Sequence, residues 1–192
     1  MWEQAVVGNY ESKPPSFTAV QSFMPDFPIQ PPKPLAFIAD AMLGRLARWL
    51  RSLGYDTAYE KAITDEVLIE RVARVDRWLL TLDRRLTLRK LLRGRHTLIA
   101  SDLVEGQLRQ LHRDLKIDLD ITHQRDYRCA DCNVVLISIS PEVAVPLVPP
   151  FVAQHYKMFL QCPRCRKVFW AGTHWEHILD RLTTMRAAEK SA

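Results

Sequence analysis

The sequence predicts an α/β protein in which a mostly parallel sheet is sandwiched by helices and followed by a small metal-stabilised segment. Two observations lead to this expectation. From Leu35 onward, short apolar runs alternate with helical patterns, which is typical of β-α units around a parallel sheet. After residue 126 this alternation stops, and two Cys-x-x-Cys pairs follow. At 192 residues the chain is long enough for one main domain with a small appendage.

A proline-rich tail precedes the first predicted strand. Seven of the twelve prolines lie in residues 1–34, so this segment is expected to be extended rather than a regular helix or a central strand. Aromatic residues interrupt it at Trp2, Tyr10, Phe17, Phe23 and Phe27. Two interpretations stay open: the tail is an extended ligand, for a protein partner or for its own domain, or it is a leader without a function.

The first half of the alternation gives two strands and two helices. Residues 35–39 (LAFIA) form a predicted strand, and residues 41–53 (AMLGRLARWLRSL) a helix whose leucines share one face. Gly54 favours the end of that helix, and residues 57–60 (TAYE) are a short second strand. Residues 64–75 (TDEVLIERVARV) then predict a helix with Thr64 as its N-cap and acids in its first turn.

The second half continues in the same way. Residues 77–82 (RWLLTL) are a strand, residues 84–94 (RRLTLRKLLRG) a helix, and residues 96–100 (HTLIA) a strand. A helix over residues 101–115 follows, with Ser101 as its expected N-cap. Beyond it we expect a strand-like run at residues 134–140, a proline-rich connection at residues 141–150, an apolar run at residues 167–170 and a terminal helix at residues 174–185.

Composition narrows the classes of function. A net charge of +5 and a pI near 9.2 suit an anionic partner such as a nucleic acid. No apolar run approaches the roughly 18 residues that a membrane helix needs, and the N-terminus lacks the layout of a signal peptide, so we expect a cytoplasmic protein without a membrane partner. The motifs typical of serine hydrolases, P-loop NTPases and dinucleotide-binding proteins are missing from the sequence.

Four acids are expected at one edge of the sheet. They follow strands or open helices at the carboxyl ends of the strands, where ligands of α/β proteins bind: Asp40, Asp65, Asp83 and Asp102. Each one alone could be a helix cap. Together, crowded carboxylates raise one another's pKa unless a cation neutralises them, so a hard divalent ion such as Mg²⁺ or Mn²⁺ is the natural occupant. Such ions activate water for phosphoryl chemistry, which makes the four acids candidate catalytic residues.

A stripe of arginines lies beside this edge. Arg45, Arg48 and Arg51 are spaced three apart on the helix that follows Asp40, where they could contact a phosphate backbone. The alternative is a solvated helix face.

The two Cys-x-x-Cys pairs predict a structural tetrahedral zinc site made by Cys129, Cys132, Cys162 and Cys165. The 29 residues between the pairs exceed the usual spacing of about 15 to 20. A redox role and a Cys162/Cys165/His174/His177 site are the competing interpretations. Near the second pair, Arg164, Arg166 and Lys167 are candidate RNA contacts, whereas the aromatic residues Phe169, Trp170 and Trp175 could stack on bases or pack the fold.

Several segments together resemble the Mut-seven C-terminal RNase family: FIADAMLGRLARWLRSLGYD, TDEVL, LLTLDRRL, SDLVEGQL and CPRCRKVFWAGTHW. The resemblance covers residues 35–182. It implies a PIN-like nuclease domain with a parallel sheet, a C-terminal zinc ribbon and a metal-dependent ribonuclease activity. It also implies that Asp40, Asp83 and Asp65 are metal ligands, with Glu66 as the alternative to Asp65, and it leaves Asp102 or Glu105 as the fourth acid.

These expectations combine into one organisation. We expect a tail at residues 1–34, a PIN-like nuclease domain at 35–126, a zinc ribbon with the terminal helix at 127–182, and a flexible C-terminus at 183–192. The leading hypothesis is an endoribonuclease with carboxylate-bound Mg²⁺ or Mn²⁺ and structural Zn²⁺. The alternatives are a non-catalytic RNA- or ribosome-binding adaptor, whose RNA affinity is salt-dependent without turnover, and a receiver-like domain that accepts a phosphoryl group.

Overall fold

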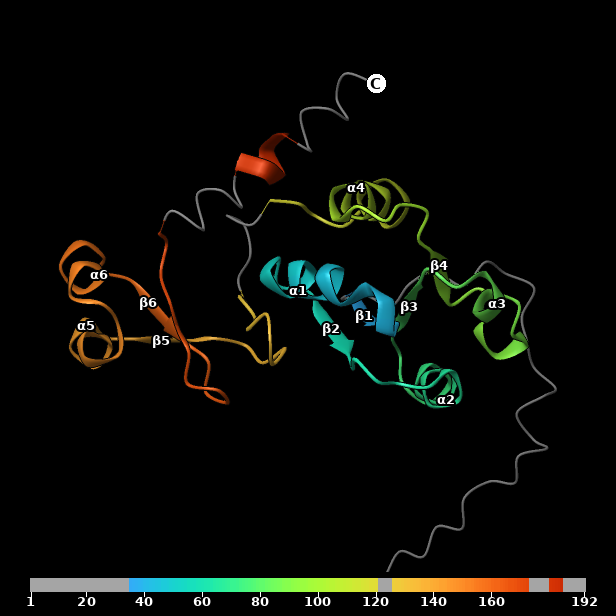
Figure 1. Ribbon diagram of the computed structural model, residues 1–192, viewed down its shortest axis with the longest axis horizontal. Coiled ribbons are helices and arrows are strands. Elements are labelled where there is room, and N and C mark those ends of the chain that lie inside the picture. Colours follow the sequence, from blue (N-terminus) through green and yellow to red (C-terminus); the bar gives the residue numbers. More distant parts are fainter. Residues whose placement is uncertain (1–34, 121–125, 173–179, 185–192) are drawn as a thin grey trace, which may run out of the picture.

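The computed structural model describes residues 35–120, 126–172 and 180–184 (Figure 1). The proline-rich tail, His174, Trp175 and His177 lie outside these residues, so the expectations about them are not addressed by the structure. Among the residues that the structure describes, no helix combines the length and the apolar character needed to cross a membrane.

A four-stranded parallel sheet forms the centre of the main domain. Its strands are β1 (Ala36–Ala39), β2 (Asp56–Tyr59), β3 (Trp78–Thr81) and β4 (His96–Leu98), in the order β2-β1-β3-β4. All three neighbouring pairs are parallel, which confirms the predicted strands and their direction. The carboxyl ends of the four strands therefore meet at one edge of the sheet, and their amino ends meet at the other.

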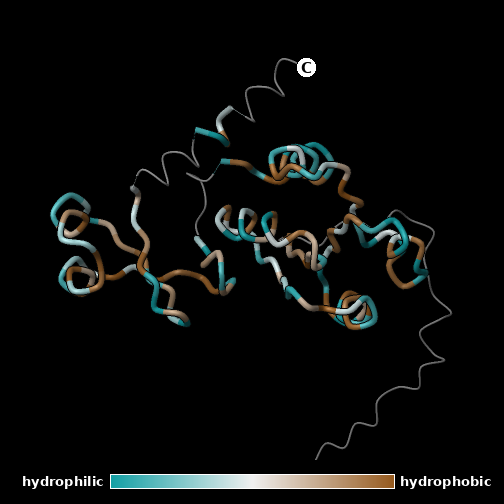
Figure 2. The backbone as a smooth tube through the Cα atoms, viewed as in Figure 1, coloured by the Kyte–Doolittle hydropathy of each residue, from teal (hydrophilic) through white to brown (hydrophobic). Residues whose placement is uncertain are grey.

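Helices cover both faces of this sheet. Side chains alternate along each strand, so each face carries buried apolar residues that need a covering layer. The 3₁₀ turn η2 (Ala41–Leu43) with α1 (Gly44–Ser52) and α4 (Val104–Leu115) packs on the face that carries Phe37, Trp78 and Leu80. The other face, with Ile38 and Leu79, is covered by α2 (Asp65–Arg74), α3 (Arg84–Thr87) and the turn η3 (Lys90–Leu92). Figure 2 shows hydrophobic residues along the central strands and a mixture of hydrophobic and hydrophilic residues on the helices. The predicted sandwich is thus confirmed.

Two predicted local signals are confirmed and two are wrong. Gly54 has φ 85° and ends α1, and the hydroxyl of Thr64 accepts a hydrogen bond from the Val67 amide at the start of α2. By contrast, residues 84–94 do not form one helix but two short turns, because Arg89 between them is extended. The hydroxyl of Ser101 accepts from the Leu103 amide in a turn, and α4 begins only at Val104, so Ser101 is not the helix cap.

The second part of the chain folds as a small antiparallel sheet. It contains β5 (Ile137–Ile139), β6 (Phe159–Gln161) and β7 (Val168–Phe169), in that order. The proline-rich connection between β5 and β6 is helical: α5 (Pro141–Ala144), the turn η5 (Val145–Leu147) and α6 (Pro150–His155). Proline occupies the first turn of each of these elements, where its missing N–H costs no hydrogen bond.

The chain returns to the main domain after this small sheet. Residues 180–184 are helical, and Leu182 is buried in the core that α1 and α4 share. The guanidinium of Arg181 lies 5.1 Å from the ring centre of Trp49 and forms an ion pair with Glu105. Residues 180–184 therefore follow the small antiparallel sheet in sequence but pack into the core of the main domain.

Side chains bond some of the outward backbone groups at both edge strands of the parallel sheet. On β2, the Thr57 amide donates to the Asn133 side chain at 3.0 Å, and the Thr57 carbonyl accepts from Arg51 Nε at 2.8 Å. Beside β4, the carboxamide of Gln110 accepts from the Ala100 amide at 2.9 Å and donates to the Leu98 carbonyl at 2.8 Å.

Candidate functional site

The four cysteines meet in one place. Their Sγ atoms all lie within 4.8 Å of one another, and those of Cys129 and Cys165 are 3.7 Å apart. A zinc ion in a tetrahedron of thiolates has Zn–S bonds of about 2.3 Å, which separates the sulfurs by about 3.8 Å. The donor set and its spacing therefore fit zinc. Within the group, the pKa of Cys165 is lowered to about 7, first by a hydrogen bond from the Lys167 backbone, whereas burial raises the pKa of Cys129 and of Cys132.

The two cysteine pairs sit in matching turns. In the first, the Cys129 amide donates to the Val134 carbonyl, and the Asn133 amide donates back to the Cys129 carbonyl. The second repeats this pattern with Cys162, Lys167 and Arg166. The residue after each pair is left-handed, Asn133 at φ 61° and Arg166 at φ 64°. We call these turns the first and second knuckles, residues 129–134 and 162–167.

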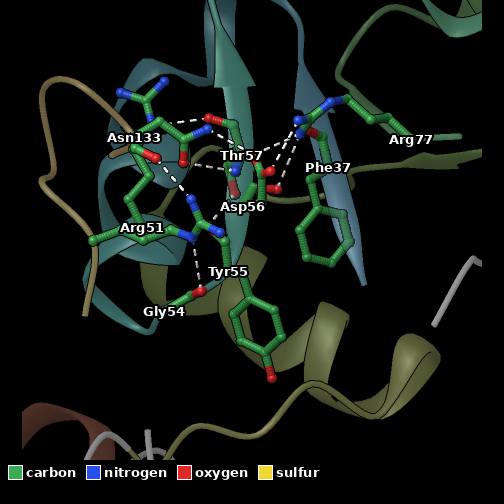
Figure 3. Close-up of polar contacts among 9 residues, drawn as sticks. Phe37, Arg51, Gly54, Tyr55, Asp56, Thr57, Arg77 and Asn133 are labelled. Atoms are coloured by element: carbon green, nitrogen blue, oxygen red, sulfur yellow. Dashed lines mark hydrogen bonds and ion pairs between the residues drawn. The ribbon is translucent and has the colours of Figure 1, made fainter. Parts of the chain in front are cut away.

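A buried arginine joins the first knuckle to the main domain. Arg51 lies at the end of α1 and is 5% exposed. Its Nη1 donates to the carbonyls of Ala130 and Asp131 at 2.8 and 3.0 Å, while its Nε donates to the Thr57 carbonyl (Figure 3). One guanidinium thus links α1, the edge strand β2 and the backbone beside the cysteines.

A second set of contacts joins the same knuckle to the amino ends of the strands. The Asn133 side chain donates to Asp56 at 2.7 Å as well as accepting from Thr57 (Figure 3). Arg77 makes two hydrogen bonds to the Asp56 carboxylate, at 2.7 and 2.9 Å, and a third to the Phe37 carbonyl. Burial acts to raise the pKa of Asp56, but the hydrogen bonds from Arg77 and Asn133 outweigh it, so this pKa is lowered overall.

These contacts distinguish the three arginines of the predicted stripe. Arg51 is a poor candidate for an RNA contact, because it is buried and its donors bond backbone carbonyls. Arg48 is exposed but forms an ion pair with Asp131 at 3.1 Å, and Lys167 binds the same carboxylate at 2.6 Å. Arg45 is exposed on the first turn of α1. Of the candidates on the second knuckle, Arg164 and Arg166 are exposed as well.

At the opposite edge, Asp40 follows β1 and is buried, with 5% of its surface exposed. One carboxylate oxygen accepts from the Met42 amide at 2.9 Å, and the other accepts from the Thr81 hydroxyl at 2.5 Å and the Leu82 amide at 2.9 Å. The three donors are neutral, so this carboxylate has hydrogen bonds but no cation among the described residues.

Asp83 is connected to Asp40 through Thr81. The Thr81 hydroxyl, which donates to Asp40, accepts from the Asp83 amide at 2.9 Å. The half-exposed Asp83 carboxylate accepts from the Arg85 amide at 2.7 Å at the start of α3. Sequence reasoning missed Thr81, although a polar residue inside the buried run RWLLTL is a visible signal.

The other two acids are exposed. Asp65 is the first residue of α2, with Glu66 beside it, and Asp102 lies two residues before α4. Glu105 forms an ion pair with Arg181 and is engaged there. Within residues 35–120, 126–172 and 180–184, the cysteines are the one group of three or more His, Cys, Asp or Glu side chains that could hold a metal ion. The structure therefore links Asp40 to the Asp83 backbone and does not gather three of the predicted acids into such a group.

A comparison with known families agrees with this architecture. The model of the Mut7-C RNAse domain matches residues 35–182. No curated protein and no solved structure gives a match.

Proposed function

The chain belongs to the Mut7-C RNAse domain family, and from this premise we propose that it is a metal-dependent endoribonuclease that hydrolyses RNA phosphodiesters at the carboxyl edge of its parallel sheet. Family membership supports a ribonuclease-type hydrolase with RNA as substrate or partner. The PIN-like site, the use of Mg²⁺ or Mn²⁺ and the roles of individual acids belong to the proposal.

The observation that carries the proposal is the environment of Asp40. A buried carboxylate is costly unless donors or a cation compensate it. Asp40 has three neutral donors, and a carboxylate offers about four acceptor positions, so one direction remains for a ligand. The Asp83 backbone amide donates to the same Thr81 hydroxyl that donates to Asp40, and both acids follow neighbouring parallel strands. Mg²⁺ commonly takes only one or two carboxylates, with water and substrate phosphates completing its shell, so this pair fits such an ion.

In the proposed reaction, the chain's own residues hold the site in place. Thr81 and the amides of Met42 and Leu82 fix the orientation of Asp40, and the start of α3 fixes Asp83. Asp65 and Asp102 assist from the exposed rim of the same edge. Asp40 and Asp83 would hold the ion, which when bound would supply Lewis-acid activation of water for in-line attack on the phosphodiester. Zinc in the cysteine group is structural.

Substitution of the two linked acids tests the proposal. Asp83→Asn keeps an oxygen for the Arg85 amide but removes the charge, and Asp40→Asn is the second variant. We expect each to lose at least about 100-fold in cleavage of a labelled single-stranded RNA with Mn²⁺. Asp114→Asn, an exposed acid paired with Arg113, is the control. Equal cutting by both folded variants would contradict the proposal.

One observation favours the second candidate, a non-catalytic RNA-binding adaptor. Asp40 and Asp83 each cap a backbone amide, of Met42 and Arg85 respectively, which is the usual structural task of acids at such positions. This candidate predicts salt-dependent RNA binding with no turnover at any Mn²⁺ concentration. The cleavage assay distinguishes the two.

The remaining parts of the proposal concern location and the tail. Four unpaired thiols in one group suit a reducing compartment, which supports a cytoplasmic location. We propose that residues 1–34 recruit a protein partner or occlude the site, that residues 35–126 and 127–182 form the nuclease domain and the ribbon, and that residues 183–192 form a flexible C-terminus. Deletion of residues 1–34 tests the tail: higher cleavage indicates occlusion, and unchanged cleavage with loss of a partner indicates recruitment.

A further inference from the structure

The connection from β3 to β4 is the most basic segment of the chain. Between Arg84 and Ser101 the sequence contains no acid and six cations: Arg84, Arg85, Arg89, Lys90, Arg93 and Arg95. This crossover, residues 84–95, thus carries more positive charge than the net +5 of the whole chain. It was not among the segments that the sequence suggested for RNA contacts.

Most of these cations are exposed and without an acidic neighbour. Arg84, Arg85, Arg89, Lys90 and Arg93 are exposed. Within the described part of the chain, Arg95 is the one crossover cation with an ion pair, to Asp76 at 3.5 Å. The exposed arginines of α2 behave differently, because Arg71 pairs with Glu60 and Arg74 with Glu70. Five of the six crossover cations therefore have no ion pair with a residue in 35–120, 126–172 or 180–184.

The crossover is anchored in the core and begins at the carboxyl edge of the sheet. It starts immediately after Asp83, and Leu86 and Leu92 anchor it in the core that Ile38 and Leu79 share. The cations consequently follow a path from the carboxyl edge of the sheet along its β4 side. The knuckles dock on β2 at the other side of the sheet, and Figure 1 shows α3 and the ribbon at opposite ends of the molecule.

We propose that the crossover binds the phosphate backbone of single-stranded RNA and guides it to the edge that carries Asp40 and Asp83. This inference rests on the proposed function and names its main binding surface. Of the cations suggested by sequence, Arg51 is buried, and Arg48 and Lys167 share the one carboxylate of Asp131. Arg45, Arg164 and Arg166 are exposed, but they lie on two separate segments and do not form a continuous run. Leu88, 83% exposed among the cations, adds an apolar surface against which unstacked bases can lie.

The test is a binding measurement without turnover. The triple variant Arg89→Gln/Lys90→Gln/Arg93→Gln avoids the residues next to Asp83. Zinc-loaded full-length protein is titrated into a fluorescent 20-nucleotide single-stranded RNA, without added Mg²⁺ or Mn²⁺. We expect binding at least about tenfold weaker at low salt, and a plot of log affinity against log salt that is less steep by about 2, since each phosphate contact to a single strand contributes about 0.7.

A matched control removes the same charge elsewhere. Arg71→Gln/Arg74→Gln/Arg113→Gln deletes three cations that have acidic partners, and should bind RNA nearly as the unaltered protein does. The proposal is overturned if the crossover variant, with an unchanged melting temperature, binds like the unaltered protein, or if the control loses as much affinity. It is also overturned if polyglutamate binds the crossover as tightly as RNA, because the surface would then serve an acidic protein.

The experiments can contradict the proposed nuclease activity and the proposed binding surface independently. Loss of cleavage with crossover-dependent binding intact would contradict the nuclease alone. Cleavage that depends on Asp83 but not on the crossover would contradict the binding surface alone.

Discussion

The two ends of the parallel sheet use acidic side chains in different ways. At the amino end, Asp56 is bonded to Arg77 and to Asn133, so its charge is matched within the fold. At the carboxyl end, the more deeply buried Asp40 has only neutral donors, and Asp83 caps a backbone amide. An acid whose charge is matched inside the protein is structural, whereas a buried acid held in place without a counterion is available to a cation from outside.

Removal of zinc should have the largest effect on this comparison. Binding of a structural zinc supplies about 10 to 16 kcal/mol in finger peptides, so without metal we expect the knuckles and β5–β7 to unfold. Hydrogen exchange should then show lost protection at the Thr57 amide, which donates to Asn133, and retained protection at the Leu79 amide in β3. One equivalent of zinc should restore the protection of the Thr57 amide. Simultaneous loss of protection in β3 would show that the two ends are one folding unit.

Replacement of Arg51 should have the next largest effect. Arg51→Met leaves three carbonyls without their charged donor, and we expect a loss of about 3 kcal/mol in the free energy of unfolding. Arg51→Lys should recover little of it, because an ammonium cannot reproduce the planar fork. Chemical denaturation with excess zinc measures both variants. A loss below about 0.5 kcal/mol in Arg51→Met would mean that the docking contributes little.

A pair of asparagine substitutions compares the two ends directly. Because the pKa of Asp56 is lowered in the folded protein, its stabilisation is present above its unfolded pKa of about 3.9 and is lost as the pH falls through the folded value. At pH 7, Asp56→Asn should therefore show the full loss, about 1 to 2 kcal/mol, because it weakens two charge-assisted hydrogen bonds from Arg77 at a partly exposed site. Asp83→Asn should cost under about 0.5 kcal/mol, since asparagine also caps. Equal losses would remove the distinction between the ends.

The smallest expected changes in stability have opposite signs in the two knuckles. Asn133 and Arg166 have the same left-handed backbone, but the Asn133 side chain bonds Thr57 and Asp56, while Arg166 is exposed. Asn133→Gly should destabilise by about 1 kcal/mol through the lost hydrogen bonds. Arg166→Gly should stabilise by a few tenths of a kcal/mol, because glycine adopts this conformation without a Cβ clash. Melting temperatures of the zinc-loaded variants check both signs.

Sequence patterns predicted the fold where the information was local. Strand runs, the leucine face of α1, the cap at Thr64 and the cysteine spacing each lie within a few residues, and the structure confirms them. The helix expected at residues 84–94 fails because Leu86 and Leu92 reach the core only if the chain extends between them.

The candidate site was less predictable, because it depends on contacts between distant segments. Parallel topology placed Asp40 and Asp83 at one edge, but their link through Thr81 depends on side-chain directions that the sequence does not specify. Arg51 looked like Arg48 on a polar stripe. Its position four residues after the buried Ala47 was a signal that Arg51 is buried too. Its carbonyl partners in the first knuckle, Ala130 and Asp131, could not be foreseen because they lie about 80 residues away.

The side chains that bond the outermost strands have a consequence for crowding and storage at high concentration. An unguarded strand invites pairing with a strand from another copy, which leads to stacked aggregates. Here Asn133 and Arg51 occupy the free side of β2, and Gln110 occupies the free side of β4. A neighbouring molecule would have to displace these groups before it could extend the sheet, so solutions of the zinc-loaded protein should resist fibril formation better than solutions of the metal-free protein.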